Sequence, residues 1–113
     1  NGLVQKCHDM GLKVIMDMIH NHVGDQHWWM KDMPTKDWVH DVKEYGMTNY
    51  RGVVQSDPYA SKYDMDKLVK GWFVPSMPDL DQRNPVLATY LIQNSIWWVE
   101  YSGVDGIRMD TYV

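Results

Sequence analysis

Arg108 and Asp110 stand at the end of a short apolar run, 104–110, and together their side chains could carry out chemistry. Because they are two positions apart, both side chains point to the same face of a strand. A buried carboxylate beside a fixed guanidinium keeps its charged form at neutral pH, which is the form that a carboxylate nucleophile needs. The same spacing also suits a structural ion pair that closes a strand end, and the spacing alone does not choose between the two.

A second polar group belongs to the apolar run 13–19, which contains Asp17 and is followed by two histidines. His20 and His22, with Asp25 nearby, could bind zinc, because imidazole and carboxylate groups are among its usual ligands. A zinc-dependent hydrolase that uses these three residues is therefore one interpretation. It leaves Asp17 without a role and gives no reason for the long segment that follows.

The elements that must position these groups follow a helix–strand–helix–strand pattern. Apolar residues at helical spacing predict the last turns of a helix over 3–11, and the run 13–19 predicts a parallel strand covered on both sides. Asn84 and Pro85 are typical of a helix start and Gly103 of a helix end, and the second apolar run is the next strand. This is an α/β crossover, in which reactive groups gather at the carboxyl ends of the strands. The buried stripe of the second helix is expected to carry Leu87, Leu91, Ser95 and Trp98.

The connection between the first strand and the second helix, residues 23–83, is unusually long. It has about sixty residues, whereas connections in α/β units usually have about 2–6. It is rich in Trp, Tyr, Asp, Lys and Pro. Insertions of this length usually carry function, for example as the walls of a binding site. We expect a short helix at about 63–69 within it and one or two small strands.

Composition and length exclude several classes of protein. Eleven Lys and Arg against 15 Asp and Glu give a net charge of −4, which argues against nucleic-acid binding because phosphates attract basic surfaces. No apolar run approaches the length of about 20 residues that a helix needs to span a membrane. With Cys7 as the single cysteine, no internal disulfide is expected. Because the chain starts at Asn1 within a predicted helix and stops after a strand, we expect an internal fragment of a larger protein, and the sequence leaves its cellular location open.

Three segments resemble motifs of the α-amylase family of glycoside hydrolases, also called glycoside hydrolase family 13. Residues 17–22 resemble the D-x-x-x-N-H segment of that family's third barrel strand, and residues 106–110 resemble its G-[FI]-R-x-D segment at the fourth strand. Residues 77–81, Met-Pro-Asp-Leu-Asp, resemble the [LM]-P-D-L-[DN] segment near the end of its inserted B domain. The continuation over 24–30 is most similar to neopullulanase and cyclomaltodextrinase-type members.

The resemblance implies a fold and a division of the chain. The fold is α/β, a partial (β/α)8 TIM barrel that runs from about strand 3 to strand 4 and carries an inserted B-domain-like excursion. Residues 1–22 would be the end of a barrel helix and a barrel strand, and residues 23–83 the inserted segment. Residues 84–113 would be a barrel helix and the strand that follows it.

The resemblance also implies an activity and roles for four residues. The parent enzyme would hydrolyse α-glucosidic bonds in maltodextrin, starch or pullulan with retention of configuration, so its partner is an α-glucan. Asp110 matches the family's catalytic nucleophile, and Arg108 matches the arginine that orients it beside the substrate. His22 matches the histidine that binds the sugar ring, and Asp17 an aspartate that supports the site. The aromatic residues of the insert would stack on sugar or pack locally, and both remain open for Trp28, Trp29, Trp38, Tyr50, Tyr59 and Trp72.

Calcium and the general acid are two further implications. In many members, residues matching Asn21 and Asp79 help to bind a structural Ca²⁺, and amide and carboxylate oxygens suit that ion. The general-acid Glu comes from the fifth strand, beyond Val113, while Glu100 lies in a predicted helix away from the strand ends. The chain alone is therefore expected to be inactive. A non-catalytic amylase-like domain that binds sugar or a partner protein remains the alternative from another class.

Overall fold

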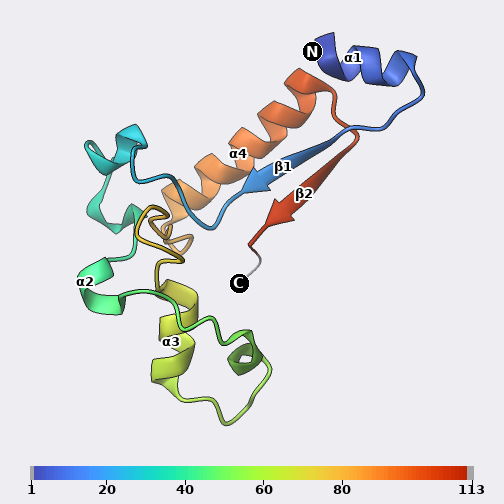
Figure 1. Cartoon of the computed structure of the whole chain (residues 1–113). Helices are drawn as coiled ribbons and strands as arrows, with labels where there is room; N and C mark the ends of the chain where they lie inside the picture. Colours follow the sequence, from blue (N-terminus) through green and yellow to red (C-terminus); the bar gives the residue numbers. More distant parts are fainter. Residues whose placement is uncertain (1, 112–113) are drawn as a thin grey trace.

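The computed structural model describes residues 2–111, which form two strands, four α-helices and three short 3₁₀ helices (Figure 1). No helix within this described range is long and apolar enough to cross a bilayer. In chain order the elements are α1 Gly2–Asp9, β1 Ile15–Ile19, η1 Trp28–Met30, η2 Lys36–Trp38, α2 Val42–Tyr45, η3 Gly52–Gln55, α3 Lys62–Lys70, α4 Pro85–Ser102 and β2 Gly106–Asp110.

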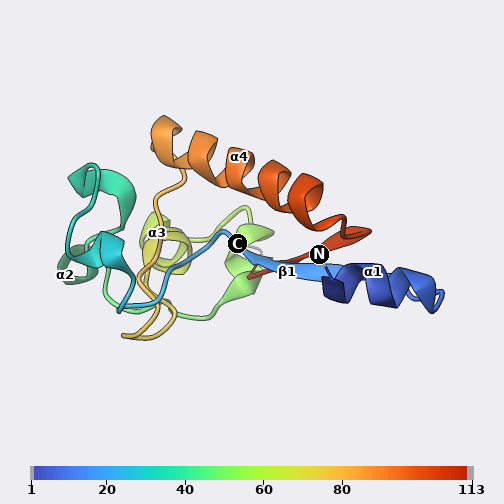
Figure 2. The same cartoon turned by 90° about the horizontal axis from the view of Figure 1, so that it is seen from above.

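The two strands pair in parallel, which confirms the predicted α/β arrangement. The register runs from Ile15 opposite Gly106 to Ile19 opposite Asp110. The helix α4 connects the insert to β2 and lies along one face of the strand pair (Figure 2). The prediction that the first strand is covered on both faces is wrong within the described residues: Met18 is buried, but Ile15 is 67% exposed, because no described element covers the face opposite α4.

The ends of α4 follow from its sequence as predicted. The side-chain oxygen of Asn84 accepts hydrogen bonds from the backbone N–H groups of Val86 and Leu87, at 2.9 and 3.1 Å. Pro85 occupies the first turn, where its missing N–H costs nothing. Gly103 ends the helix in the left-handed conformation, with φ of 73°, which glycine adopts without a steric penalty.

The largest hydrophobic core lies between the insert and the first half of α4 rather than against the strands. Trp29 and Trp38 meet edge to face with ring centroids 4.9 Å apart, and Leu87 of α4 is fully buried beside them. The predicted apolar stripe of α4 is therefore correct at its beginning and wrong further on, since Trp98 is 39% exposed. The core cluster consists of Trp29, Trp38, Val39, Leu80, Leu87 and Leu91.

The insert consists of short helices and loops, several of which are joined by hydrogen bonds between distant segments. The helix α3 confirms the predicted helix at 63–69, and the hydroxyl of Ser61 caps it by accepting from the N–H of Asp64. The one or two small strands expected in this segment are absent from the described residues. In their place, three isolated bridges join distant parts of the chain: His22 with Asp79, Val39 with Leu80, and Met47 with Trp72.

Candidate active site

Arg108, in the middle of β2, lies between the carboxylate of Asp17, in the middle of β1, and that of Asp110, at the carboxyl end of β2. Register places Asp17 of β1 directly opposite Arg108 of β2, so their side chains share one face of the sheet. Nη1 of Arg108 is 2.6 Å from Oδ2 of Asp17 and 2.7 Å from Oδ1 of Asp110. One guanidinium therefore holds both carboxylates in a fixed arrangement.

The electrostatics favour the ionised form of Asp110. The hydroxyl of Thr111 donates to Oδ2 of Asp110 at 2.8 Å and lowers the pKa of that carboxyl, with Arg108 acting in the same direction against partial burial. The hydrogen bonds that Arg108 donates to the two carboxylates raise its own pKa, with the larger effect from Asp17 and the smaller from Asp110. The side chain of Asp110 is 25% exposed and that of Arg108 is 58% exposed, because no described element covers the face of the strand pair opposite α4.

Thr111 was not singled out from the sequence. It adopts a positive φ of 48°, which is uncommon for a residue that is not glycine. A hydroxyl next to a carboxylate carries no distinctive spacing signal, so only the backbone geometry shows that this side chain turns back to Asp110.

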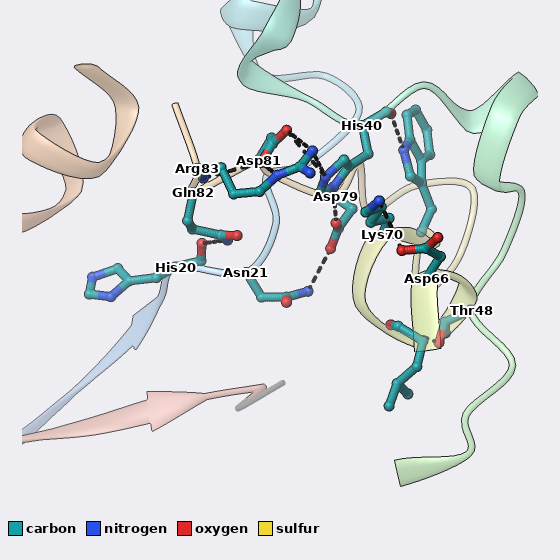
Figure 3. Close-up of polar contacts among 12 residues, drawn as sticks. His20, Asn21, His40, Thr48, Asp66, Lys70, Asp79, Asp81, Gln82 and Arg83 are labelled. Carbon is teal, nitrogen blue, oxygen red and sulfur yellow. Dashed lines mark hydrogen bonds and ion pairs between the residues drawn. The ribbon is translucent and has the colours of Figure 1, made fainter. Parts of the chain in front are cut away.

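The two histidines after β1 lie in different surroundings. Nε2 of His20 is 2.8 Å from the hydroxyl of Ser95 on α4, and the ring points away from Asn21 (Figure 3). His22 is half-buried, pairs with Asp79 through a backbone bridge, and its Nδ1 has no hydrogen-bond partner within the described range. Across residues 2–111, no group of three or more His, Cys, Asp or Glu side chains is arranged to hold a metal ion. The zinc interpretation therefore finds no ligand set there.

Asn21 and Asp79 are brought together as predicted, but not as calcium ligands. The amide nitrogen of Asn21 donates to Oδ1 of Asp79 at 3.1 Å, and Nδ1 of His40 lies 2.7 Å from Oδ2 (Figure 3). Burial raises the pKa of Asp79, and the hydrogen bonds from His40 and Asn21 oppose this. Calcium takes about six to eight oxygen ligands, whereas nitrogen groups already meet both carboxylate oxygens here. The residues present do not fit a calcium ion in this arrangement.

His40, Asp81 and Arg83 extend this contact and were not predicted from the sequence. Arg83 forms a forked pair with Asp81, with Nη2 at 2.6 Å from Oδ2 and Nε at 2.8 Å from Oδ1. The Arg83 hydrogen bonds lower the pKa of Asp81 against its partial burial. An aspartate two positions before an arginine was the available signal for this pair, but nothing in the sequence connects His40 to either.

A pocket of about 220 Å³ opens between the strand ends and the insert. Tyr50 and Phe73 form one wall, with ring centroids 5.2 Å apart in an edge-to-face contact. Among the aromatic residues considered for stacking, Trp29 and Trp38 are core residues, whereas Tyr50 lines this pocket. Its lining includes Asn21, Thr48, Tyr50, Phe73, Asp79 and Thr111.

Comparison with known proteins gives a consistent result over the whole chain. The family profile described as "Alpha amylase, catalytic domain" matches residues 1–113. A cyclomaltodextrinase from Geobacillus thermopakistaniensis is 30% identical over 115 residues, which cover 96% of this chain and 17% of that protein. Neopullulanase 2 from Thermoactinomyces vulgaris is 32% identical over 119 residues, which cover 96% of this chain and 17% of that protein.

Solved structures show the same similarity in three dimensions. The α-amylase from Geobacillus thermoleovorans, crystallised with acarbose, superposes with a TM-score of 0.72 at 38% identity, covering 96% of this chain and 21% of that one. A cyclomaltodextrinase structure superposes with a TM-score of 0.61 at 28% identity, covering 97% and 18%. The chain thus spans about a fifth of the length of these relatives.

Proposed function

The chain belongs to the alpha-amylase catalytic-domain family, and from this premise we propose that the protein containing it hydrolyses α-glucosidic bonds. Its substrates are maltodextrin-, starch- or pullulan-type glucans, in keeping with relatives named cyclomaltodextrinase and neopullulanase. The observation that carries the proposal is the bridge that Arg108 makes between Asp17 and Asp110, at 2.6 and 2.7 Å. It holds a carboxylate ionised and aimed at one edge of the sheet.

In this proposal the two strands are the third and fourth strands of a (β/α)8 barrel. Residues 1–22 supply the end of a barrel helix and β1, residues 23–83 form the B-domain-like insert, and residues 84–113 supply α4 and β2. Two observations support it: the strands are parallel with a helical crossover, and Asp110 is the last residue of β2, at the carboxyl end where barrels place their active sites.

Asp110 is the nucleophile of a retaining mechanism. A carboxylate oxygen of Asp110 attacks the anomeric carbon while the bond from that carbon to the leaving oxygen breaks, and a general acid gives the leaving oxygen its proton. Water then attacks the glycosyl ester, gives its proton to the same group and restores the Asp110 carboxylate. The hydrogen bond from Thr111 and the ion pair with Arg108 keep Asp110 ionised for the first step.

The second carboxyl group comes from outside this chain. A retaining site needs two carboxyl groups about 5–5.5 Å apart, one of them protonated. Asp17 does not supply the protonated group, because its ion pair with Arg108 favours the carboxylate. Glu100 lies on α4, which runs along one face of the sheet, and not at the strand ends. The 113 residues by themselves are therefore inactive, and activity belongs to the longer protein.

His22 and the pocket supply the contacts to the sugar. His22 lies three residues after the end of β1, and it makes a small contribution to the lowered pKa of Asp110, after those of Thr111 and Arg108. The pocket lined by Tyr50, Phe73 and Thr111 also includes Asn21, the residue before His22, and aromatic walls with a polar end suit a sugar ring. Asp17 supports the site by fixing Arg108.

Trapping the glycosyl-enzyme tests this function. The full protein is incubated with a fluorinated α-glucosyl fluoride, which slows hydrolysis of the ester, and peptides are mapped by mass spectrometry. We expect one glucosyl adduct, on Asp110, and none in the Asp110→Asn variant. A folded protein that binds maltodextrin but gains no adduct would instead be a non-catalytic sugar-binding relative, and an adduct on another carboxylate would refute the assignment of Asp110.

A further inference from the structure

His40 is a buried polar residue that the proposed chemistry does not use. Its Nδ1 lies 2.7 Å from Oδ2 of Asp79, and the two side chains are only 5% and 4% exposed. Its Nε2 lies 3.3 Å from Oδ2 of Asp81. The backbone fixes the ring as well, since the N–H of His40 donates to the carbonyl of Asp79 at 2.9 Å and its carbonyl accepts from Nε1 of Trp72 at 2.8 Å.

Asp79, the partner of His40, is the point where the insert meets the end of β1. Its side chain accepts from Asn21, and its backbone pairs with His22 in an antiparallel bridge. The flanking residues continue this contact: the N–H of Leu80 donates to the carbonyl of Asn21 at 2.8 Å, and the N–H of Val23 donates to the carbonyl of Pro78 at 3.1 Å. Any movement of Asp79 is therefore passed on to His22.

Because the His40–Asp79 pair is buried, His40 is important for holding the Asp79 carboxylate in place. Loss of one member of a buried pair leaves the other polar group without a partner, which costs far more than the loss of an exposed pair. Without His40, Oδ2 of Asp79 would lie in the interior with no donor beside it. The carboxylate would then turn toward water or another donor and pull the bridge to His22 with it.

We propose that His40 is a positioning residue whose imidazole stands beside Asp79 where a cation would otherwise be needed, so that the insert is joined to β1 and His22 without a metal ion (Figure 3). The consequence for catalysis rests on the proposed function. The consequence for stability does not, and it can be measured on an inactive protein.

Two isosteric variants of the full protein separate positioning from simple loss of packing. In His40→Asn the amide nitrogen reaches the place of Nδ1, whereas in His40→Gln it reaches the place of Nε2, and both amides can donate. We expect kcat on maltodextrin to stay near the wild-type value in His40→Asn and to fall by about tenfold to a hundredfold in His40→Gln, because misplacement near a site is costly. KM should change little in either variant.

Val54→Ala is the matched control. Val54 is a buried residue of η3 in the insert, outside the His40 network. Its truncation lowers the melting temperature, but it should leave kcat unchanged at temperatures where the protein is folded. A fall in kcat in His40→Gln without a fall in Val54→Ala shows that the effect comes from position and not from a weakened insert.

A second experiment tests for a metal ion by comparing the melting temperature of the wild-type protein in millimolar Ca²⁺ with that in a chelator. We expect the two values to agree within about 1 °C, because a ligand stabilises only a state that it binds. A saturable rise with Ca²⁺, together with one bound ion per chain, would overturn the proposal. So would a His40→Gln variant as active and as stable as His40→Asn. If the wild-type protein does not act on α-glucans, the proposed function fails, and a melting temperature of His40→Gln well below that of His40→Asn still decides in favour of His40.

Discussion

Asp17 and Arg108 are register partners on neighbouring parallel strands, and Nη1 of Arg108 donates to Oδ2 of Asp17 at 2.6 Å. The pair joins residues far apart in sequence on the face of the sheet to which Asp110 also belongs. Both side chains are more than half exposed in this chain. An exposed ion pair adds little to stability, about 0–1 kcal/mol, so the arrangement is explained better by what it does to Asp110 than by what it does for the fold.

Replacing Asp17 by alanine should therefore separate activity from stability. In Asp17→Ala we expect the free energy of unfolding of the full protein to change little, because Arg108 keeps its ion pair with Asp110. The value of kcat on maltodextrin should fall by about tenfold or more, because Arg108 loses one of the two partners that fix it. Denaturant titration and initial rates measure the two quantities. Unchanged kcat in a folded variant would remove Asp17 from the site.

The Asp110→Asn variant should fold and bind maltodextrin but turn over at least about a thousandfold more slowly, as expected when a nucleophile is removed. An amide has nearly the shape of the carboxylate but cannot form the glycosyl ester. Asp32→Asn, at an exposed position of the insert, is the control and should retain full activity. Near-normal turnover by Asp110→Asn would contradict its role as nucleophile.

The hydroxyl of Thr111 should set the acid limb of the pH profile. The pKa of Asp110 is lowered in the folded protein, so the active carboxylate is present above that pKa and is lost as the pH falls through it. In Thr111→Val the hydrogen bond that lowers the pKa of Asp110 is removed, so this pKa rises and the acid limb of kcat/KM should move to higher pH. Thr111→Ser keeps the hydroxyl, so its acid limb should match that of the wild-type protein. Identical pH profiles of kcat/KM for Thr111→Val and Thr111→Ser would contradict a role of the hydroxyl.

Leu87→Ala should destabilise the full protein by about 2–5 kcal/mol, because truncating a fully buried leucine leaves a cavity. Val86, its neighbour in the first turn of α4, is 62% exposed. Val86→Ala should change the free energy of unfolding by less than about 0.5 kcal/mol. Equal losses in the two variants, measured by denaturant titration, would show that the core between α4 and the insert is placed incorrectly.

Asn84→Ala should cost about 0.5–2 kcal/mol, because two N–H groups of the first turn lose their acceptor. Asn84→Asp keeps a capping oxygen but loses the bond that the amide nitrogen donates to the hydroxyl of Thr35 and places a negative charge near Asp37. We therefore expect the melting temperature of Asn84→Asp to lie between those of the wild-type protein and Asn84→Ala. An alanine variant as stable as the wild type would contradict the capping role.

Elements with strong local signals could be predicted from the sequence. Asn84, Pro85 and Gly103 each act within one turn of the chain, so the limits of α4 follow from local chemistry. The two strands follow from their apolar runs in the same way. The prediction of small strands in the insert was wrong for the described residues. The bridges found there join single residues of distant segments, such as His22 and Asp79, and do not extend into strands.

The site shows the same division. The spacing of Arg108 and Asp110 predicted a shared face, and the structure confirms their contact. His40 could not be predicted, since it reaches Asp79 across 39 positions and no local pattern records that distance. The expected cover of β1 on both faces failed for a related reason: the burial of a strand depends on which other elements pack on it, and α4 covers only one face of the pair.

The pairing of β1 with β2 also bears on the order in which the molecule folds. Contact between Asp17 and Arg108 closes a loop of 91 positions, and the entropy lost in closing a chain grows with its length. The core around Trp29 and Trp38 needs shorter closures, since it joins residues within the insert and to the start of α4. We expect tryptophan fluorescence to recover early in refolding and the Arg108 bridge to form late. A partly refolded molecule would then already have its core while its two strands were still apart.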